Sequence, residues 1–200
     1  MKPGSFVLLP IVSLLLLAGF ARGAEPDLAD EVLKMTGART KIVWQHEVLA
    51  HDGDDGYGWM ACYELRGFDT VDGISRVILP GPASYGDPWI TPDGERIVYT
   101  EGNGKGGVIA NGIVWVVDWA GTSKRKLLDN GRALAVWQHP TDGSIWVYAV
   151  TAGAGSTIFR FRLDDPKVLE VVFTKALLYL HNQWRSNALR RGCQASCTVA

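Results

Sequence analysis

The sequence lacks several features that would point to common classes of protein. Its 20 Lys and Arg residues are balanced by 21 Asp and Glu residues, so there is no basic surplus with which to bind nucleic acid. Cysteine occurs only at Cys62, Cys193 and Cys197, and an odd number cannot form a closed set of disulfides. Long periodic helical patterns are nearly absent. The G-x-S-x-G motif is also absent, which argues against a serine peptidase.

The sequence also offers little for a metal ion, a cofactor or a catalytic group. Residues 102–107 are rich in glycine, but they lack the G-x-x-x-x-G-K-[ST] spacing and the following helix of a phosphate-binding loop. Residues 51–56 include acidic side chains, but their alternation is not that of an EF-hand. The four histidines fall in different predicted elements: His46, His51, His139 and His181. We therefore predict no catalytic residue, no metal site and no cofactor.

The first 24 residues are typical of a secretory signal peptide. Lys2 supplies a positive charge, residues 6–19 form an apolar run rich in leucine, and Ala21-Arg22-Gly23 offers the small residues that a signal peptidase recognises. The run is short for a membrane span and no second run follows it. We predict a protein of the periplasm or the outside of the cell, with no membrane insertion after cleavage.

One helix is predicted, in a helix and linker segment over residues 25–40. Asp27 can cap a helix that runs to Met35, and Gly37 can end it. Its expected apolar stripe consists of Leu28, Val32, Leu33 and Met35. We expect this stripe to pack against the edge of a sheet.

From Lys41 onward the chain repeats a pattern of short strands and tight turns. In the clearest copy, Trp89 and Ile90 lead into Pro92-Asp93-Gly94, a typical turn, and β-branched and aromatic residues follow over 97–100. The predicted strands are 41–44, 60–68 and 76–79 in the first unit; one ending near 90, then 96–100, 113–118 and 125–128 in the second; and 133–137, 145–150, 158–163 and 169–173 in the third.

The units recur at a spacing typical of propeller blades. Trp89, Trp137 and Trp184 lie about 48 residues apart, and a period of about 40–50 residues with four strands each indicates a propeller. We predict an all-β fold, a partial β-propeller of about three four-stranded antiparallel blades over residues 41–185, followed by an irregular tail over 186–200. We expect four strand residues in the core: Cys62, Trp115, Trp137 and Trp146. The three tryptophans are expected to pack between blades.

These residues resemble the repeat of the six-bladed TolB-like propeller family, whose blades carry a W/F-S-P-D-G turn and a strand of the form I-Y-V-V-D-x-D-G. Residues 89–94 and 114–121 match this pattern, the third unit is looser at Thr141-Asp142-Gly143, and the first unit lacks its opening strand. The resemblance covers residues 41–184 and implies the propeller fold. Its members include periplasmic scaffold proteins, propeller domains of serine peptidases and some polysaccharide lyases, so fold alone does not choose the function.

The repeat array is shorter than a closed ring of typically four to eight blades. Residues 177–184 lie where a fourth blade should open, but no Pro-Asp-Gly turn follows them. One hypothesis is that the tail is a truncation or frameshift product of a longer propeller gene, which downstream DNA without further blades would rule out. The other is a half-propeller completed by a second copy. Open sheet edges in either case predict self-association or poor solubility.

We predict an exported, non-catalytic binding or scaffold module whose partners are proteins or glycans of the envelope. The alternatives are a remnant of a carbohydrate-active propeller enzyme similar to a polysaccharide lyase, which a bound metal would indicate, and a truncated product without function. Loops between fourth and first strands, and between second and third strands, emerge on one face. The predicted ligand-binding residues lie there: Tyr85, Asp87 and Asn103. The ligand, and the pairing of Cys193 with Cys197, are left open.

Overall fold

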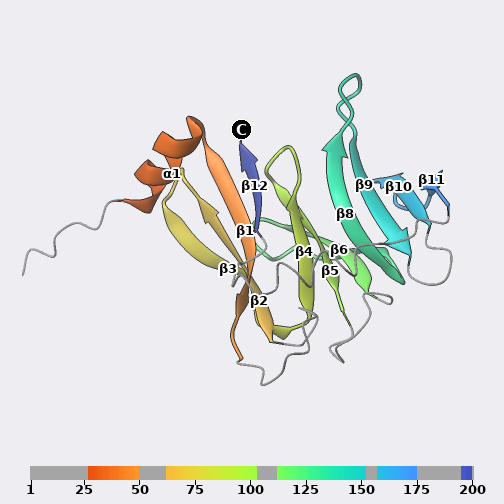
Figure 1. The fold of residues 1–200 in the computed structure, drawn as a ribbon, viewed down its shortest axis with the longest axis horizontal. Helices are drawn as coiled ribbons and strands as arrows, with labels where there is room; N and C mark the ends of the chain where they lie inside the picture. The colour runs from red at the N-terminus through yellow and green to blue at the C-terminus, as the bar shows by residue number, and fades with distance from the viewer. Residues whose placement is uncertain (1–26, 50–61, 103–111, 152–156, 175–194, 200) are drawn as a thin grey trace, which may run out of the picture.

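Three four-stranded antiparallel sheets stand side by side, with one short helix at one end of the row (Figure 1). The computed structural model describes residues 27–49, 62–102, 112–151, 157–174 and 195–199, the last range by its backbone only. We call the sheets blades 1, 2 and 3. The fold is the predicted one, all-β and a partial β-propeller of three four-stranded blades.

The strands of each blade lie side by side in the following spatial order. Blade 1 consists of β12 (Ala195–Val199), β1 (Thr40–Glu47), β2 (Tyr63–Asp69) and β3 (Ile74–Ala83). Blade 2 consists of β4 (Tyr85–Ile90), β5 (Arg96–Glu101), β6 (Ile113–Asp118) and β7 (Arg125–Leu128). Blade 3 consists of β8 (Gly131–Gln138), β9 (Ile145–Thr151), β10 (Ile158–Arg162) and β11 (Glu170–Phe173).

The turn between β4 and β5 forms for the reasons that its sequence suggests. Gly94 has a φ of 73°, which a residue with a side chain adopts only at a cost, and its amide donates to the Thr91 carbonyl at 2.7 Å. The Asp93 carboxylate accepts from the Glu95 amide at 3.0 Å. In β5, which follows, Ile97, Val98 and Tyr99 are fully buried.

The C-terminal strand completes blade 1. β12 pairs with β1 in antiparallel register, with Ile42 opposite Cys197 and Trp44 opposite Ala195. The opening strand that the first unit lacks in sequence therefore comes from the far end of the chain. Residues 186–200 are predicted to be an irregular tail, whereas residues 195–199 form a strand.

The helix α1 (Leu28–Thr36) has the predicted ends but not the predicted apolar face. The Asp27 carboxylate accepts from the Ala29 amide at 3.0 Å, and Gly37 ends the helix with a φ of 73°. Only Ala29 and Val32 are buried; they pack on Phe68, with Ile42 and Trp44 beside them. The other three residues of the expected stripe are exposed: Leu28, Leu33 and Met35. The helix thus covers a face of blade 1 rather than a sheet edge.

Two apolar cores join the blades. The core between blades 1 and 2 brings together Val43, Leu65 and Ile78 with Ile97 and Trp119, and Trp115 packs against it. The core between blades 2 and 3 contains Val98, Val114, Val116, Leu127, Ala133, Ile145, Val147, Ala149, Phe159, Phe161 and Leu163. Since each core takes side chains from two sheets, no blade buries its apolar surface alone.

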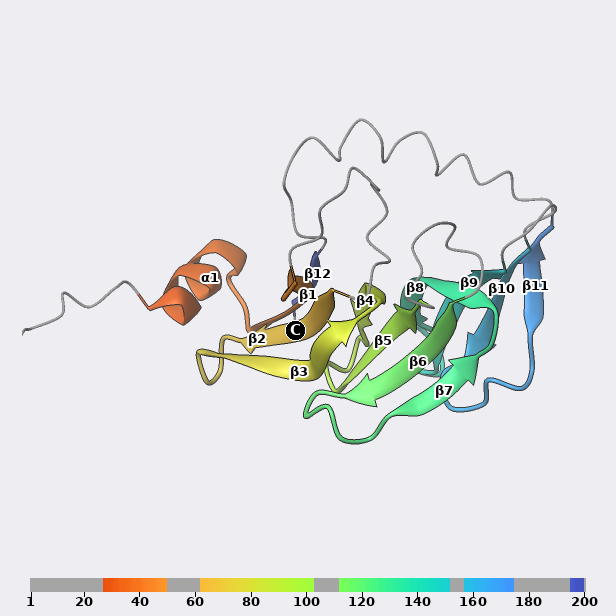
Figure 2. The same ribbon diagram turned by 90° about the horizontal axis from the view of Figure 1, so that it is seen from below.

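The predicted ligand-binding face is the side of the molecule on which β4 and β8 begin. β4 begins where β5 ends, with Tyr85 opposite Glu101, and β8 begins where β9 ends, with Gly131 opposite Thr151 (Figure 2). Tyr85 and Asp87, near the start of β4, therefore lie toward this side.

Candidate functional site

The predicted ligand-binding residues lie at the start of β4, so far as the structure describes them. Tyr85 and Asp87 belong to β4, and Asn103 lies outside the described residues. Tyr85 and Asp87 are each only 7% exposed. Both contact a neighbouring blade, and their role in binding a ligand stays a prediction.

Asp87 forms a buried ion pair that joins blade 2 to blade 3. The pairing of β4 with β5 is irregular between Gly86 and Trp89, and Asp87 has a φ of 47° there, in the left-handed region. Its Oδ2 accepts from Arg132 Nε at 2.5 Å, and its Oδ1 accepts from Arg132 Nη2 at 2.7 Å. Removing two charges from water is costly, so the two-point contact is needed to offset that cost.

Tyr85 links blade 2 to blade 1. Its backbone carbonyl accepts a hydrogen bond from the Gln45 side chain of β1. Its ring meets the Tyr99 ring edge to face, with centroids 5.5 Å apart. Burial, followed by the charge of Glu101, raises the pKa of Tyr85. At neutral pH this phenol is therefore a neutral packing group, which suits a junction between blades.

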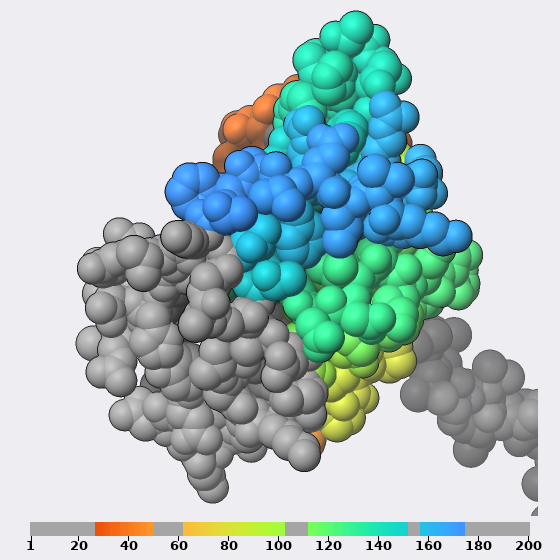
Figure 3. Space-filling model, turned by 90° about the vertical axis from the view of Figure 1, so that its right-hand side faces the viewer, coloured from red at the N-terminus to blue at the C-terminus, as the bar shows by residue number. Residues whose placement is uncertain are grey.

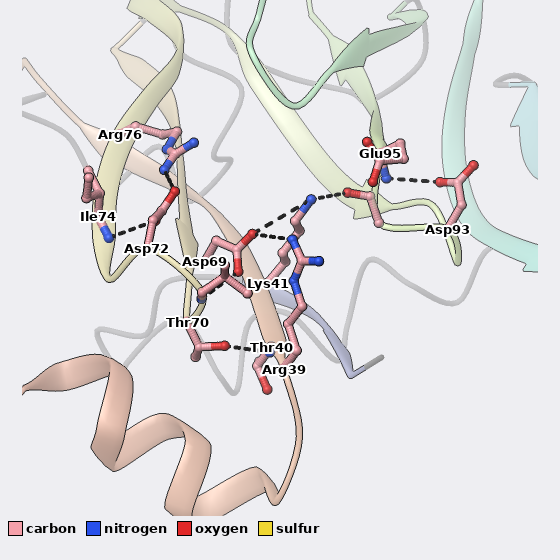
Figure 4. A network of polar contacts seen from close by, with 12 residues as sticks. Arg39, Thr40, Lys41, Asp69, Thr70, Asp72, Ile74, Arg76, Asp93 and Glu95 are labelled. Carbon is pink, nitrogen blue, oxygen red and sulfur yellow. Dashed lines mark hydrogen bonds and ion pairs between the residues drawn. The ribbon is translucent and has the colours of Figure 1, made fainter.

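A second polar junction between blades 1 and 2 lies at the opposite end of the strands (Figure 4). Lys41 of β1 is buried, donates to the Gly94 carbonyl at 2.6 Å and lies 4.8 Å from the Trp119 ring centroid. Asp69 accepts from Arg39 at 2.9 Å and lies 3.9 Å from the Lys41 ammonium. Burial acts to raise the pKa of Asp69, but the hydrogen bonds and cations outweigh it, and the pKa lies below its ordinary value.

The turn after β6 brings blade 2 into backbone contact with blade 1. Asp118 accepts from the Thr122 hydroxyl and the Thr122 amide, each at 2.7 Å, and these bonds lower the pKa of Asp118 to about 2. Gly121 follows with a φ of 78°, and a Cβ placed there would lie 2.0 Å from the Ile78 carbonyl oxygen. The turn therefore fits against β3 only with glycine at this position.

Sequence reasoning missed the residues that make these junctions. Arg132 and Lys41 are both at least nine-tenths buried, although they stand in short strand patterns that give no sign of a partner in another blade. The one available signal for such a residue is a lysine or arginine within a strand segment that is otherwise mostly apolar. Their partners come from other repeat units, and no local pattern identifies them.

An apolar surface stands at the outer edge of blade 3. Five of the six residues over 168–173 have large apolar side chains that are between 48% and 64% exposed: Val168, Leu169, Val171, Val172 and Phe173. We call residues 168–173 the apolar edge. The described part of the chain has 14 exposed large apolar residues, so more than a third of them lie in this one short segment.

The outer strands of the other two blades differ from β11. β3 contains Pro80 and Pro82, which cannot donate a backbone hydrogen bond, and β7 begins with the exposed basic residues Arg125 and Lys126. Both are devices that discourage another strand from pairing. β11 has neither, and within the described residues it pairs on one side only, with β10.

Neither a metal centre nor a membrane-spanning helix is found among the described residues. No group of three or more His, Cys, Asp or Glu side chains there is arranged to hold a metal ion. No helix in the same part of the chain is both long enough and apolar enough to cross a membrane.

The fold and the site define a partial propeller with polar ties between blades and an exposed apolar edge, and similar solved structures include TolB proteins. A protein described as a TolB from Agrobacterium tumefaciens is 20% identical over 56% of this chain and 41% of its own, with a TM-score of 0.41. TolB from Acinetobacter baumannii is 14% identical over 72% of this chain and 34% of its own, with a TM-score of 0.45.

Oligogalacturonate lyase from Vibrio parahaemolyticus is also similar, at 18% identity over 56% of this chain and 30% of its own, with a TM-score of 0.41. The chain thus spans between 30% and 41% of the length of these three proteins. No protein-family model matches the chain, and no curated protein matches it.

Proposed function

We propose that the chain is an exported, non-catalytic binding module that holds a partner protein on the apolar edge of blade 3. The observation that carries this proposal is the exposure of five large apolar side chains over residues 168–173. Exposed patches of this kind mark interaction sites when their neighbours are polar. The buried ties between the blades supply a scaffold on which the edge is held.

The chemistry of the edge favours a protein segment over a glycan. Valine, leucine and phenylalanine side chains offer no hydrogen bonds, whereas a glycan is covered with hydroxyl groups that need partners when water is removed. An extended protein segment can satisfy the outer backbone groups of β11 and can place apolar side chains against Val171 and Phe173. The partner is therefore a protein with an extended apolar segment.

Export supports the choice of compartment. Residues 1–24 have the charge, the apolar run and the small residues of a signal peptide. A chain that is exported in this way meets its partners in the periplasm or outside the cell.

A peptide selection tests the proposal. We expect random linear heptapeptides displayed on phage to yield binders with apolar residues at alternate positions, because strand addition sets that period. Val171→Lys should weaken the selected peptides about tenfold or more, since a lysine on an edge strand opposes pairing. Isothermal titration calorimetry with one selected peptide, made synthetically, measures the change in affinity.

The matched control is Val77→Lys, which places the same charge on an exposed valine of β3. It should leave peptide binding unchanged. An array of glycans is tested in parallel with the same protein. Ligands on the array with none from the peptide selection would reject the proposal, and so would selected peptides that bind Val171→Lys as tightly as the original chain.

A further inference from the structure

The two end faces of the row of blades are covered by the chain's own groups. α1 packs on blade 1 through Ala29 and Val32, where a preceding blade would otherwise sit. At the other end, Trp146 of β9 is buried beneath two guanidinium groups, with Arg160 4.6 Å and Arg162 5.4 Å from its ring centroid. Among the described residues, neither end face therefore presents an open apolar sheet.

Trp146, Arg160 and Arg162 stand at positions of blade 3 whose equivalents in blade 2 belong to the core between blades 2 and 3. Trp89 pairs with Val98 in blade 2 and Trp137 pairs with Trp146 in blade 3, so Val98 and Trp146 hold equivalent places. By the same register, Arg160 and Arg162 replace two buried valines of β6 that pack against blade 3: Val114 and Val116. A further blade stacked here would have to desolvate two cations.

Their carboxylate partners hold the arginines in place. Arg160 donates to Glu170 at 2.9 Å, and Arg162 donates to Asp142 at 3.3 Å. A second copy that completes a ring would meet this polar surface face to face. The apolar edge is different, because its exposed side chains carry no charge except that of Glu170, which Arg160 already compensates.

We infer that the partner on the apolar edge is a second copy of this chain, joined edge to edge through β11 in antiparallel orientation. The inference rests on the proposed function and names its partner. An antiparallel pair about a twofold axis that passes between the two Val171 residues places valine opposite valine, and the two Glu170 side chains then do not stand directly opposite each other. Without Lys2 and Arg22 of the signal peptide, 18 basic residues stand against 21 acidic ones, and this small net charge of −3 leaves little repulsion between copies.

The position and length of β11 set the form of the dimer. β11 lies at the end of the molecule away from α1, and the blue residues 157–174 form part of the surface seen from that end (Figures 1 and 3). The ladder to β10 shifts register there, with Phe173 opposite Ile158 and Val171 opposite Phe159, which leaves Val172 between them. A four-residue strand with such a bulge makes a small interface, so the dimer should dissociate on dilution.

Light scattering on the purified exported chain, at a series of concentrations, tests this inference. The mass should rise from one chain to two as the protein is concentrated, and Val171→Lys should move the midpoint to at least about tenfold higher concentration. Val77→Lys should not move it. Separately, Val171→Cys should form a disulfide between two copies at that position, identified in a digest, whereas Val77→Cys should not.

The outcomes separate this inference from the proposed function. A chain that stays monomeric, or a dimer that Val171→Lys leaves intact and that gives no disulfide at position 171, overturns the second-copy inference. If linear peptides are still selected in that case, the edge binds a different protein and the proposed function stands. If no peptide is selected either, both fail.

Discussion

Arg132→Met is expected to destabilise the protein by about 3–5 kcal/mol, the usual cost of leaving one partner of a buried ion pair alone. Arg132 donates twice to Asp87, and the side chains of the pair are only 10% and 6% exposed. Methionine fills similar space but leaves the Asp87 carboxylate buried without its cation. Against a typical stability of about 5–15 kcal/mol, this loss is large. Urea unfolding measures it.

Two controls identify the cause of the expected loss. Adding Asp87→Asn to Arg132→Met removes the stranded charge, and asparagine tolerates the positive φ of 47° at that position. The double variant should therefore be more stable than Arg132→Met alone. Arg76→Met breaks a far more exposed pair with Asp72 and should cost no more than about 1 kcal/mol. Equal losses in Arg132→Met and Arg76→Met would contradict a special role for the buried pair.

Gly121→Ala is expected to cost about 2–5 kcal/mol, from a strained backbone together with a collision between blades. The φ of 78° disfavours any side chain, and the added Cβ would lie 2.0 Å from the Ile78 carbonyl oxygen of β3. Because the obstacle is backbone, relief requires blade 1 and blade 2 to move apart. Urea unfolding again gives the free energy.

Gly37→Ala is the matched control for the backbone term. Gly37 has a similar φ of 73°, but a Cβ there would meet no atom within 4 Å. This variant should lose only about 1–2 kcal/mol. A Gly121→Ala variant that loses no more than Gly37→Ala would show that the contact between the turn and β3 is not tight.

The sequence predicted most strands because turn residues and β-branched runs act locally. The bounds of β6 and β7 are the predicted ones, and the Pro92-Asp93-Gly94 turn forms as expected. The sequence does not predict β12, because the pairing of residues 195–199 with β1 joins segments far apart in the chain, and no local pattern indicates such a contact.

The tryptophans show that a shared register does not place every strand tryptophan between blades. Ile90 pairs with Ile97 in the β4–β5 hairpin, and Gln138 pairs with Ile145 in the β8–β9 hairpin. The two hairpins therefore have equal length, although the turn glycine occupies a different place in each. Trp146 holds the place that Val98 holds in blade 2, on the face away from the preceding blade, and it therefore lies beneath its arginines rather than between blades 2 and 3. Trp137 is 39% exposed, which also contradicts the expected core position.

The candidate site was less predictable than the fold. Loop geometry predicts that Tyr85 and Asp87 lie on the binding face, but their contacts to Gln45 and Arg132 depend on how the blades stand beside one another. The apolar edge has the same composition as a buried strand. Only the place of β11 as the last strand of blade 3 shows that its side chains are exposed.

Hydrogen exchange of the backbone amides, at a concentration where the chain is monomeric, tests the central claim most directly. We expect slow exchange in β5, β6 and β9, protection of residues 195–199 by β1, and fast exchange of the β11 amides that do not pair with β10. Binding of a selected peptide should slow those β11 amides. Fast exchange at residues 195–199 would contradict a blade 1 that is completed by β12. Exchange in β11 as slow as in β9 would contradict a blade 3 with an open edge.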